Sequence, residues 1–179
     1  REILAVVSGF SGAGKGTLME ALMAKYDNYA LSISATTRQP RDNEEHGKQY
    51  FFVSETEFDN MVENDQFIEY ARYVEHSYGT PKEYVMEQLE AGKDVILEIE
   101  IQGALKVKEK FPETLLIFVT PPSAEELKRR LIGRGTETMD VVEARLQRAC
   151  QEAEQMDRYD YLLINDQVEP CMEELHRLI

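Results

Sequence analysis

The sequence has few cysteines, no long apolar run and a shortage of positive charge. Its two cysteines, Cys150 and Cys171, lack metal-ligand spacing, which excludes a disulfide framework or a cysteine-based metal cluster as the basis of the fold. No apolar stretch approaches the roughly 20 residues of a membrane-spanning helix. No signal peptide is visible, and Arg1 indicates a trimmed start. We expect a cytoplasmic protein without a membrane partner, with both cysteines as inert packing residues.

Positive charge is scarce, because 20 Lys and Arg residues face 34 Asp and Glu residues, a net charge of −14. Such a chain repels nucleic acid and acidic membranes on average, so neither is expected as a partner. Two basic clusters stand out against this background. Residues 128–148 carry six basic residues against three acidic ones, and Arg38, Arg41 and Lys48 form the other cluster. These clusters favour binding of a polyanion, while the sequence names no protein partner.

Apolar, β-rich runs alternate with helical patterns along most of the chain. Continuous apolar runs are typical of strands buried on both faces of a sheet. The predicted strands cover 3–8, 94–100, 114–120 and 159–165, and the predicted helices between the later strands cover 102–111, 123–132 and 139–156. This alternation predicts an α/β fold with a parallel sheet flanked by helices.

Residues 33 to about 83 interrupt this alternation with short alternating pieces and one short predicted helix near 55–63. We interpret residues 33–83 as an inserted domain, so that 1–32 and 84–179 form the core. A helix is predicted to begin at Pro81 and to end at Gly92, because proline suits the first turn of a helix and glycine its end.

The stretch "GFSGAGKGT" directly follows the first apolar run and fits the phosphate-loop pattern Gly-x-x-x-x-Gly-Lys. Small residues let backbone N–H groups converge on phosphate oxygens, and the following helix adds the positive end of its dipole. Lys15 then brings a full positive charge to the β- and γ-phosphates. The predicted ATP-binding residues of this loop are Gly9, Phe10, Ser11, Gly12, Ala13, Gly14, Lys15, Gly16 and Thr17.

Gly16 stands where many phosphate-loop enzymes have a hydroxyl that ligates Mg²⁺. A magnesium ion, the expected cofactor with ATP, must therefore rely on the nucleotide, on water or on a carboxylate. Glu98 and Glu100 lie at the end of the predicted strand 94–100, and carboxylates at that end of a parallel strand face the ligand crevice. Glu98 is the candidate metal contact, either directly or through water.

A second anion site distinguishes a kinase from a nucleotide hydrolase, which passes the phosphoryl group to water. The inserted segment offers such a site, because Arg38 and Arg41 can fork onto one phosphate. Tyr50 and Tyr78 add neutral donors, and Glu44 can hold an arginine in place.

The phosphate loop and five later motifs resemble the guanylate kinase family. In chain order these motifs are "S-x-S-x-T-T-R-x-P-R-x-x-E-x-x-G-x-x-Y", "FIEYA", "YGT", "LEIEIQGA" and "RLIGRGTET". The resemblance covers essentially the whole chain. It implies a phosphate-loop α/β fold with a core, an inserted GMP-binding domain and a lid at about 134–140. It also implies an enzyme that converts GMP and ATP to GDP and ADP with Mg²⁺.

The resemblance implies roles for individual residues. The implied catalytic residues are Lys15, Arg38, Arg134 and Arg145. Arg134 also joins the ATP site, where Asn165 would contact the base. The implied GMP phosphate site comprises Arg38, Arg41, Tyr50 and Tyr78, with Glu44 beside it. The implied guanine-reading residues are Ser34, Glu69 and Thr80, and Glu100 completes the GMP site. The family often has "LDID" where this chain has "LEIE", so the two carboxylates here have a longer reach.

Two other functions stay open at this point. One is a related kinase of similar fold for another phosphorylated acceptor. The other is a non-catalytic, guanylate-kinase-like interaction module. Such modules characteristically have a degraded phosphate loop, whereas Gly9, Gly14 and Lys15 are present here, and both lid arginines are in place. The sequence therefore favours the enzyme.

Overall fold

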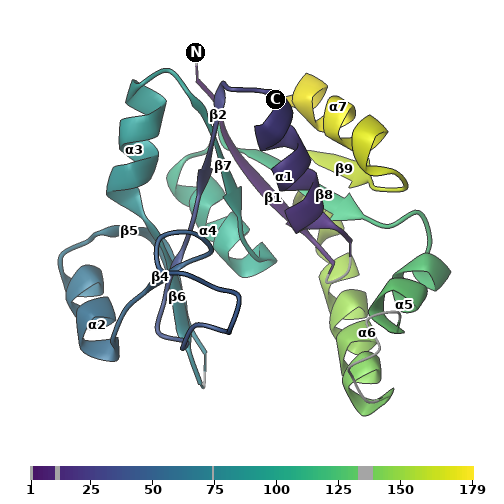
Figure 1. The fold of residues 1–179 in the computed structure, drawn as a ribbon, viewed down its shortest axis with the longest axis horizontal. Helices are drawn as coiled ribbons and strands as arrows, with labels where there is room; N and C mark the ends of the chain where they lie inside the picture. Colours follow the sequence, from purple (N-terminus) through teal and green to yellow (C-terminus); the bar gives the residue numbers. More distant parts are fainter. Residues whose placement is uncertain (1, 11–12, 74, 133–138) are drawn as a thin grey trace.

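The computed structural model describes residues 2–10, 13–73, 75–132 and 139–179. The core of the molecule is a five-stranded parallel sheet in the order β2-β7-β1-β8-β9 (Figure 1). Its strands, in that order, are Tyr29–Ser32, Asp94–Glu98, Leu4–Gly9, Leu115–Thr120 and Tyr161–Ile164. The predicted α/β fold with a parallel sheet flanked by helices is confirmed.

The helices that the sequence predicts agree with the structure to within a few residues. Their bounds are Lys15–Lys25 (α1), Glu55–Glu63 (α2), Lys82–Glu90 (α3), Ile101–Lys110 (α4), Ala124–Ile132 (α5), Met139–Ala153 (α6), the 3-10 turn Met156–Arg158 (η1) and Val168–Leu178 (α7). In Figure 1, α1 and α7 lie side by side on one face of the sheet, and α4 lies on the other.

Three expectations for these elements were incomplete or wrong. The predicted strand 94–100 is too long, because β7 ends at Glu98 and Glu100 is already the N-cap of α4. The short strand β2 and the helix α7 were not predicted at all. Pro81 is the N-cap of α3 and the last residue of a strand, not a residue of the first helical turn.

The apolar runs of the sequence form the core of the large sheet. Val6, Ile96 and Ile117 on its three central strands are completely buried, and Leu18 and Leu22 of α1 pack against them. This arrangement fixes the position of the loop between β1 and α1, because both flanking elements are locked into the core.

The two cysteines differ. Cys171 lies in the core, and burial raises the pKa of its thiol to about 11. Cys150 is exposed, so the expectation that both cysteines are packing residues is wrong for Cys150.

A second, four-stranded sheet lies within the interrupted segment 33–83, in the order β4-β3-β6-β5. Its strands, in that order, are Phe51–Phe52, Ala35–Thr36, Ser77–Pro81 and Phe67–Arg72. Its own small core is made of Ala35, Phe58 and Phe67, and the predicted helix near 55–63 is present as α2. The assignment of this segment as a separate domain stays a prediction.

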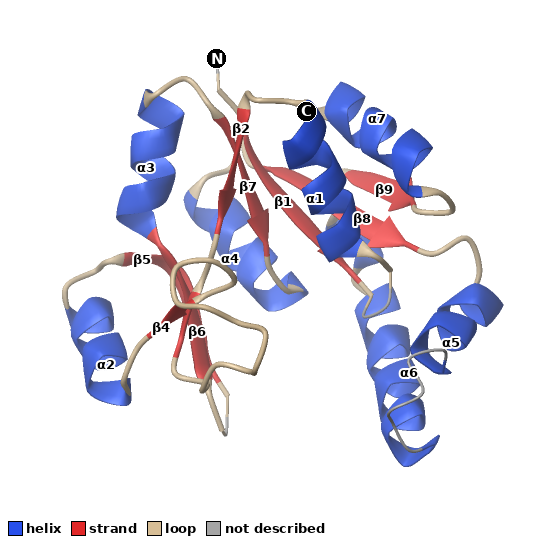
Figure 2. Cartoon of the chain, in the orientation of Figure 1, coloured by secondary structure: helices blue, strands red, loops and turns tan. Residues whose placement is uncertain are grey.

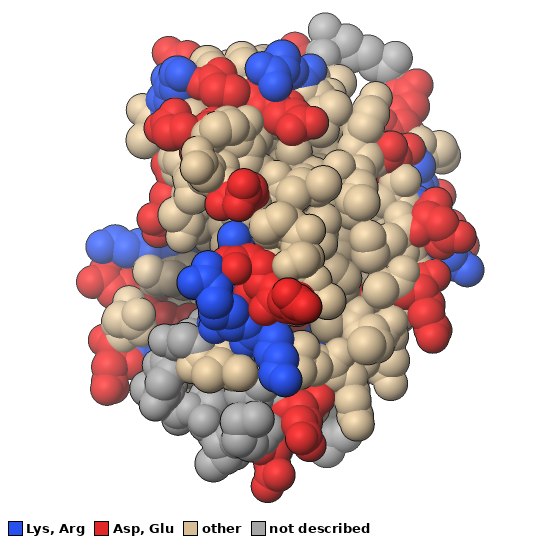
Figure 3. Space-filling view, turned by 90° about the vertical axis from the view of Figure 1, so that its right-hand side faces the viewer, with Lys and Arg blue, Asp and Glu red and all other residues tan. Residues whose placement is uncertain are grey.

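The second sheet and the α5–α6 pair project from the same edge of the large sheet, where β1 and β7 end (Figure 2). Both chain ends shown lie at the opposite edge. On the side of the molecule shown in Figure 3, acidic and basic side chains are both spread over the surface, and one group of basic side chains lies near its centre. Among the described residues, no helix is both long enough and apolar enough to cross a membrane.

Candidate active site

The loop between β1 and α1 is set by two glycines that accept no other side chain without strain. A Cβ on Gly9 would lie 2.4 Å from the Val119 carbonyl oxygen, because β1 and β8 approach closely there. Gly14 has a φ of 85°, in the left-handed region, and is the N-cap of α1. The loop residues Ser11 and Gly12, which the sequence also assigns to ATP, lie outside the described residues. The described part places the N-terminus of α1 at the carboxyl end of β1, as an anion site requires.

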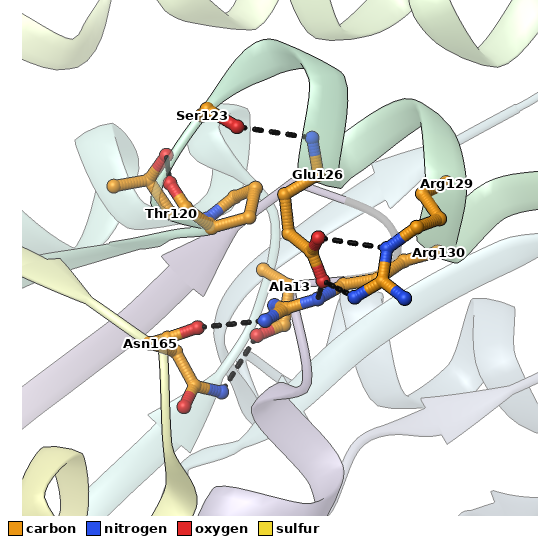
Figure 4. Close-up of polar contacts among 8 residues, drawn as sticks. Ala13, Thr120, Ser123, Glu126, Arg129, Arg130 and Asn165 are labelled. Atoms are coloured by element: carbon orange, nitrogen blue, oxygen red, sulfur yellow. Dashed lines mark hydrogen bonds and ion pairs between the residues drawn. The ribbon is translucent and has the colours of Figure 1, made fainter.

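Asn165 supports this loop from below (Figure 4). Its side-chain Nδ2 donates to the Ala13 carbonyl at 2.8 Å, and its own backbone carbonyl accepts from Arg130 Nη2 at 3.0 Å. Glu126 in turn holds Arg130, with 3.0 Å between the paired atoms. Asn165 is only 4% exposed, so its structural contact is with the loop. The implied contact of Asn165 with the ATP base stays a prediction.

Lys15 lies at the mouth of the loop and lines a cavity of about 590 Å³. Its Nζ donates to the Gly9 and Phe10 carbonyls, both at 3.1 Å. Arg145 of α6 lines the same cavity, so the structure brings two of the implied catalytic residues to one wall. Arg134 and most of the implied lid at 134–140 lie outside the described residues. Gly16 and Thr17 are exposed at the start of α1, and a Cβ on Gly16 would meet no atom within 4 Å.

A second cavity of about 610 Å³ lies beside the first, between the two sheets. Five of the residues assigned to GMP line it: Ser34, Tyr50, Glu69, Tyr78 and Glu100. They come from the inserted segment and from the N-cap of α4. The fold thus brings together five positions that are distant in sequence.

Glu69 is the most buried charged group of this cavity, with 7% of its surface exposed. Burial raises the pKa of its carboxyl, although the hydrogen bond from Thr80 and the charge of Lys106 oppose the shift. Thr80 Oγ1 donates to Glu69 Oε1 at 2.8 Å. Gly103 of α4 makes room for the carboxylate, because a Cβ there would lie 3.0 Å from Glu69 Oε2. A buried carboxylate in a cavity is a recognition group for a ligand that presents hydrogen-bond donors.

Arg38 is held by a carboxylate from its own loop. Glu44 accepts from both Arg38 terminal nitrogens, at 2.9 and 3.0 Å, and from the Arg41 backbone N–H at 2.9 Å. The pKa of Glu44 is lowered, first by the hydrogen bond with Arg38. The guanidinium also lies over the Tyr50 ring, 5.2 Å from its centroid. Glu44 thus holds an arginine as predicted from the sequence, while the Arg41 residue is exposed on the surface.

The two cavities share the wall formed by Glu98, Ile99 and Glu100, together with Tyr50 and Arg148. Glu98 is reached by solvent, but the surrounding cleft walls partly desolvate it and raise its pKa, against the opposing charge of Lys15. Within the described residues, no group of three or more His, Cys, Asp and Glu side chains could hold a metal ion. A magnesium ion that keeps several of its waters and binds together with a nucleotide needs only one or two carboxylates from the protein.

Sequence reasoning missed three residues of these walls. Tyr73 and Arg148 line the second cavity, and Gly103 shapes the space around Glu69. Arg148 lies three residues after Arg145 on α6, and this helical spacing was a signal that could have found it. Tyr73 and Gly103 gave no such local signal, because their role depends on the packing of β5 and α4.

Comparisons with known proteins point to one family. The family described as "Guanylate kinase" matches residues 1–179. A guanylate kinase of Caldanaerobacter subterraneus subsp. tengcongensis is 53% identical over 177 residues, which cover 99% of this chain and 86% of that protein. One of Lactococcus lactis is 48% identical, covering 100% of this chain and 87% of that protein. The crystal structure of guanylate kinase from Anaplasma phagocytophilum is 30% identical with a TM-score of 0.79, covering 99% and 84% of the two chains.

Proposed function

The chain belongs to the guanylate kinase family, and we propose that it transfers the γ-phosphoryl group of ATP to GMP where its two cavities meet. One observation carries the assignment of the site. The cavity that contains Lys15 and the cavity that contains the buried Glu69 share a wall at Glu98–Glu100. A donor and an acceptor nucleotide bound in these cavities would bring their phosphates together at that wall.

On the donor side, ATP binds with its phosphates at the N-terminus of α1. The backbone N–H groups there and the charge of Lys15 stabilise the negative charge of the phosphates. Lys15 reaches the loop carbonyls at 3.1 Å, so its amine is already at the mouth of the loop. Arg145 adds a second cation on the same cavity wall. Phosphoryl transfer needs little covalent chemistry from the protein, so positioning and charge are the main contributions.

On the acceptor side, Glu69 reads the guanine. Guanine presents N1–H and the 2-amino group as adjacent donors, and a carboxylate accepts from both. Thr80 already donates its proton to Glu69, so it orients the carboxylate instead of binding the guanine oxygen. Ser34, on the same cavity wall, is then the donor to O6. Adenine has no N1 proton and carries an amino group where guanine has O6, so the site rejects AMP.

The GMP phosphate lies toward Tyr50 and Tyr78, whose rings are 5.9 Å apart on the cavity wall. The Arg38 guanidinium lies over the Tyr50 ring, and its two hydrogen bonds to Glu44 fix the plane of the guanidinium. A fixed planar fork loses less entropy when it binds a phosphate than a free side chain does. Arg41 joins it from the surface of the same loop. We expect the inserted segment 33–83 and the lid to close over both nucleotides, which excludes water as a competing acceptor.

Glu98 is the residue of this chain that would hold a magnesium ion bound together with ATP, directly or through water. Such an ion would supply charge neutralisation for the phosphates. Gly16 contributes no hydroxyl to it, so the protein's own hold on the metal is weak.

The test of this function is a coupled ADP-release assay with ATP and four acceptors, GMP, AMP, CMP and UMP. We expect efficient turnover with GMP and a preference over AMP of about 10⁴-fold in kcat/KM. Preference for any other monophosphate would assign the second cavity to a different acceptor. ADP release without dependence on any acceptor would indicate a hydrolase.

A further inference from the structure

Glu100 is held from two sides by residues of two other elements. The Tyr73 hydroxyl donates to Glu100 Oε2 at 2.7 Å, and Arg148 Nη2 lies 2.9 Å from Glu100 Oε1. Tyr73 follows β5 in the inserted segment, Glu100 caps α4 in the core, and Arg148 belongs to α6. One carboxylate therefore joins three parts of the molecule that lie far apart in sequence.

These contacts lie where the two cavities meet. Glu100 and Arg148 line both cavities, and Tyr73 lines the second one. Arg148 Nε is also 3.3 Å from a Glu152 oxygen, so the guanidinium has carboxylates on two sides. The charge of Glu100 raises the pKa of Arg148, which therefore stays protonated.

The ion pair gains little stability from its surroundings. The Arg148 and Glu100 side chains are 60% and 54% exposed, and exposed ion pairs contribute little to folding. Its effect is geometric. A glutamate side chain has three rotatable bonds, so an unheld carboxylate samples many positions. Two hydrogen-bond donors, one on each oxygen, restrict the Glu100 carboxylate to one position.

We propose that Tyr73 and Arg148 are positioning residues that hold the Glu100 carboxylate at the boundary between the two cavities for the acceptor nucleotide. Each carboxylate oxygen has two acceptor sites. Glu100 can therefore accept a hydrogen bond from the acceptor nucleotide while Tyr73 and Arg148 hold it. Arg148 also offsets the negative charge of Glu100 where the phosphates of two nucleotides converge. The proposal rests on the proposed function, because it assigns these residues to the GMP side of the same site.

The test is a double-mutant cycle with steady-state kinetics for both substrates. The single variants are Tyr73→Phe, Arg148→Met and Glu100→Gln, with the two pairwise combinations that include Glu100→Gln. We expect Tyr73→Phe and Arg148→Met each to raise KM for GMP by about threefold to tenfold, the effect of one hydrogen bond. KM for ATP should change less than about twofold. In the Glu100→Gln background each substitution should add less than about twofold, because the group that it positions is already altered.

Two further variants separate positioning from structure. Arg148→Lys keeps the charge and should restore part of the GMP affinity. Arg129→Met removes an arginine that is also paired with a carboxylate, Glu126, but lines neither cavity, so KM for GMP should not change. Thermal unfolding of every variant should stay within about 2 °C of the wild type.

Each remaining outcome contradicts the proposal. Full additivity of Arg148→Met with Glu100→Gln would mean that Arg148 binds substrate by itself. An unchanged KM for GMP in both Tyr73→Phe and Arg148→Met would mean that the contacts have no part in the reaction. Either result overturns this inference alone if the wild type phosphorylates GMP. A wild type that does not use GMP would overturn the proposed function itself.

Discussion

The donor and acceptor ends of the cleft are built in different ways. The donor end is a loop of consecutive residues, and its shape is set by backbone conformation. Gly9 is required by the close approach of β8, and Gly14 by a left-handed φ of 85°. Both flanking elements are anchored in the main core. The donor site is therefore a local feature of the sequence that a rigid scaffold fixes.

The acceptor end depends on side chains that meet only in the folded chain. Glu69 contacts Thr80 on the neighbouring strand and packs against Gly103 on α4. The sheet that carries Glu69 has a small core of three buried residues, Ala35, Phe58 and Phe67.

Two lysines of α4 also bind this sheet. Lys106 Nζ donates to the Tyr70 carbonyl at 2.8 Å, and Lys110 Nζ to the Ile68 carbonyl at 2.5 Å. Because β5 is an edge strand, these lysines satisfy backbone groups that no other strand pairs. Ile68 of β5 also packs in the main core, so the acceptor end is joined to that core through α4 and β5.

The largest expected effect is at the donor end. Lys15→Met removes one fixed positive charge near the transferring phosphoryl group and keeps the length of the side chain. We expect kcat to fall by at least about 10²-fold, with a much smaller change in KM for GMP. Lys25→Met, at the other end of α1, is the control and should keep its turnover. Turnover close to wild type in Lys15→Met would remove the loop from the mechanism.

The next effect is expected at the acceptor end. Glu69→Gln replaces the carboxylate by an amide, whose NH2 group would face one of the two guanine N–H donors and could not accept from it. We expect kcat/KM for GMP to fall by at least about tenfold, the equivalent of one charged hydrogen bond. KM for ATP should stay nearly constant, because the donor cavity does not include Glu69. Glu57→Gln on α2, in the same inserted segment, serves as the control. Equal losses for both nucleotides would show that the two ends do not act separately.

A smaller effect is expected when the space around Glu69 is reduced. Gly103→Ala would place a Cβ 3.0 Å from the Glu69 carboxylate, so the side chain must shift by a few tenths of an ångström. We expect KM for GMP to rise about threefold, within the range of one weakened hydrogen bond. The exposed Glu109→Ala on the same helix should leave it unchanged. A rise in KM for ATP instead would place this part of α4 on the donor side.

The same difference between the two ends explains what could be predicted from sequence. The phosphate loop was recognised because its determinants are consecutive, and the strands β1 and β8 because their apolar runs are continuous. Glu100 was assigned to a strand, because the apolar residues on either side of it continue the strand pattern up to the start of α4. Tyr73 was missed, because its role depends on a contact with Glu100 that no spacing encodes. Arg148 was missed although it lies three residues after Arg145 on the same helix. The residue-by-residue assignments of ATP and GMP contacts remain predictions.

The smallest expected effect is a pH dependence of stability that belongs to the acceptor end. Burial raises the pKa of Glu69, so the folded chain holds this proton more tightly than the unfolded chain does. A raised carboxyl pKa contributes stability that is fully present below the unfolded pKa, near pH 4, and is lost as the pH rises through the folded pKa. Glutamine at this position does not titrate and can still accept from Thr80. The free energy of unfolding of Glu69→Gln, relative to wild type, should therefore increase between about pH 4 and pH 7, by an amount on the order of 1 kcal/mol.

Urea unfolding of both proteins at several pH values, without nucleotide, measures this difference, and the other titrating groups cancel in the comparison. A flat difference for Glu69→Gln, or one that decreases with pH, would mean that the carboxylate is not destabilised by its site. If the difference increases with pH as expected, the gain in stability and the loss of GMP turnover appear in the same variant, Glu69→Gln. The carboxylate that recognises the base then lowers the stability of the acceptor end, whereas the backbone geometry that forms the donor end is compatible with a stable fold.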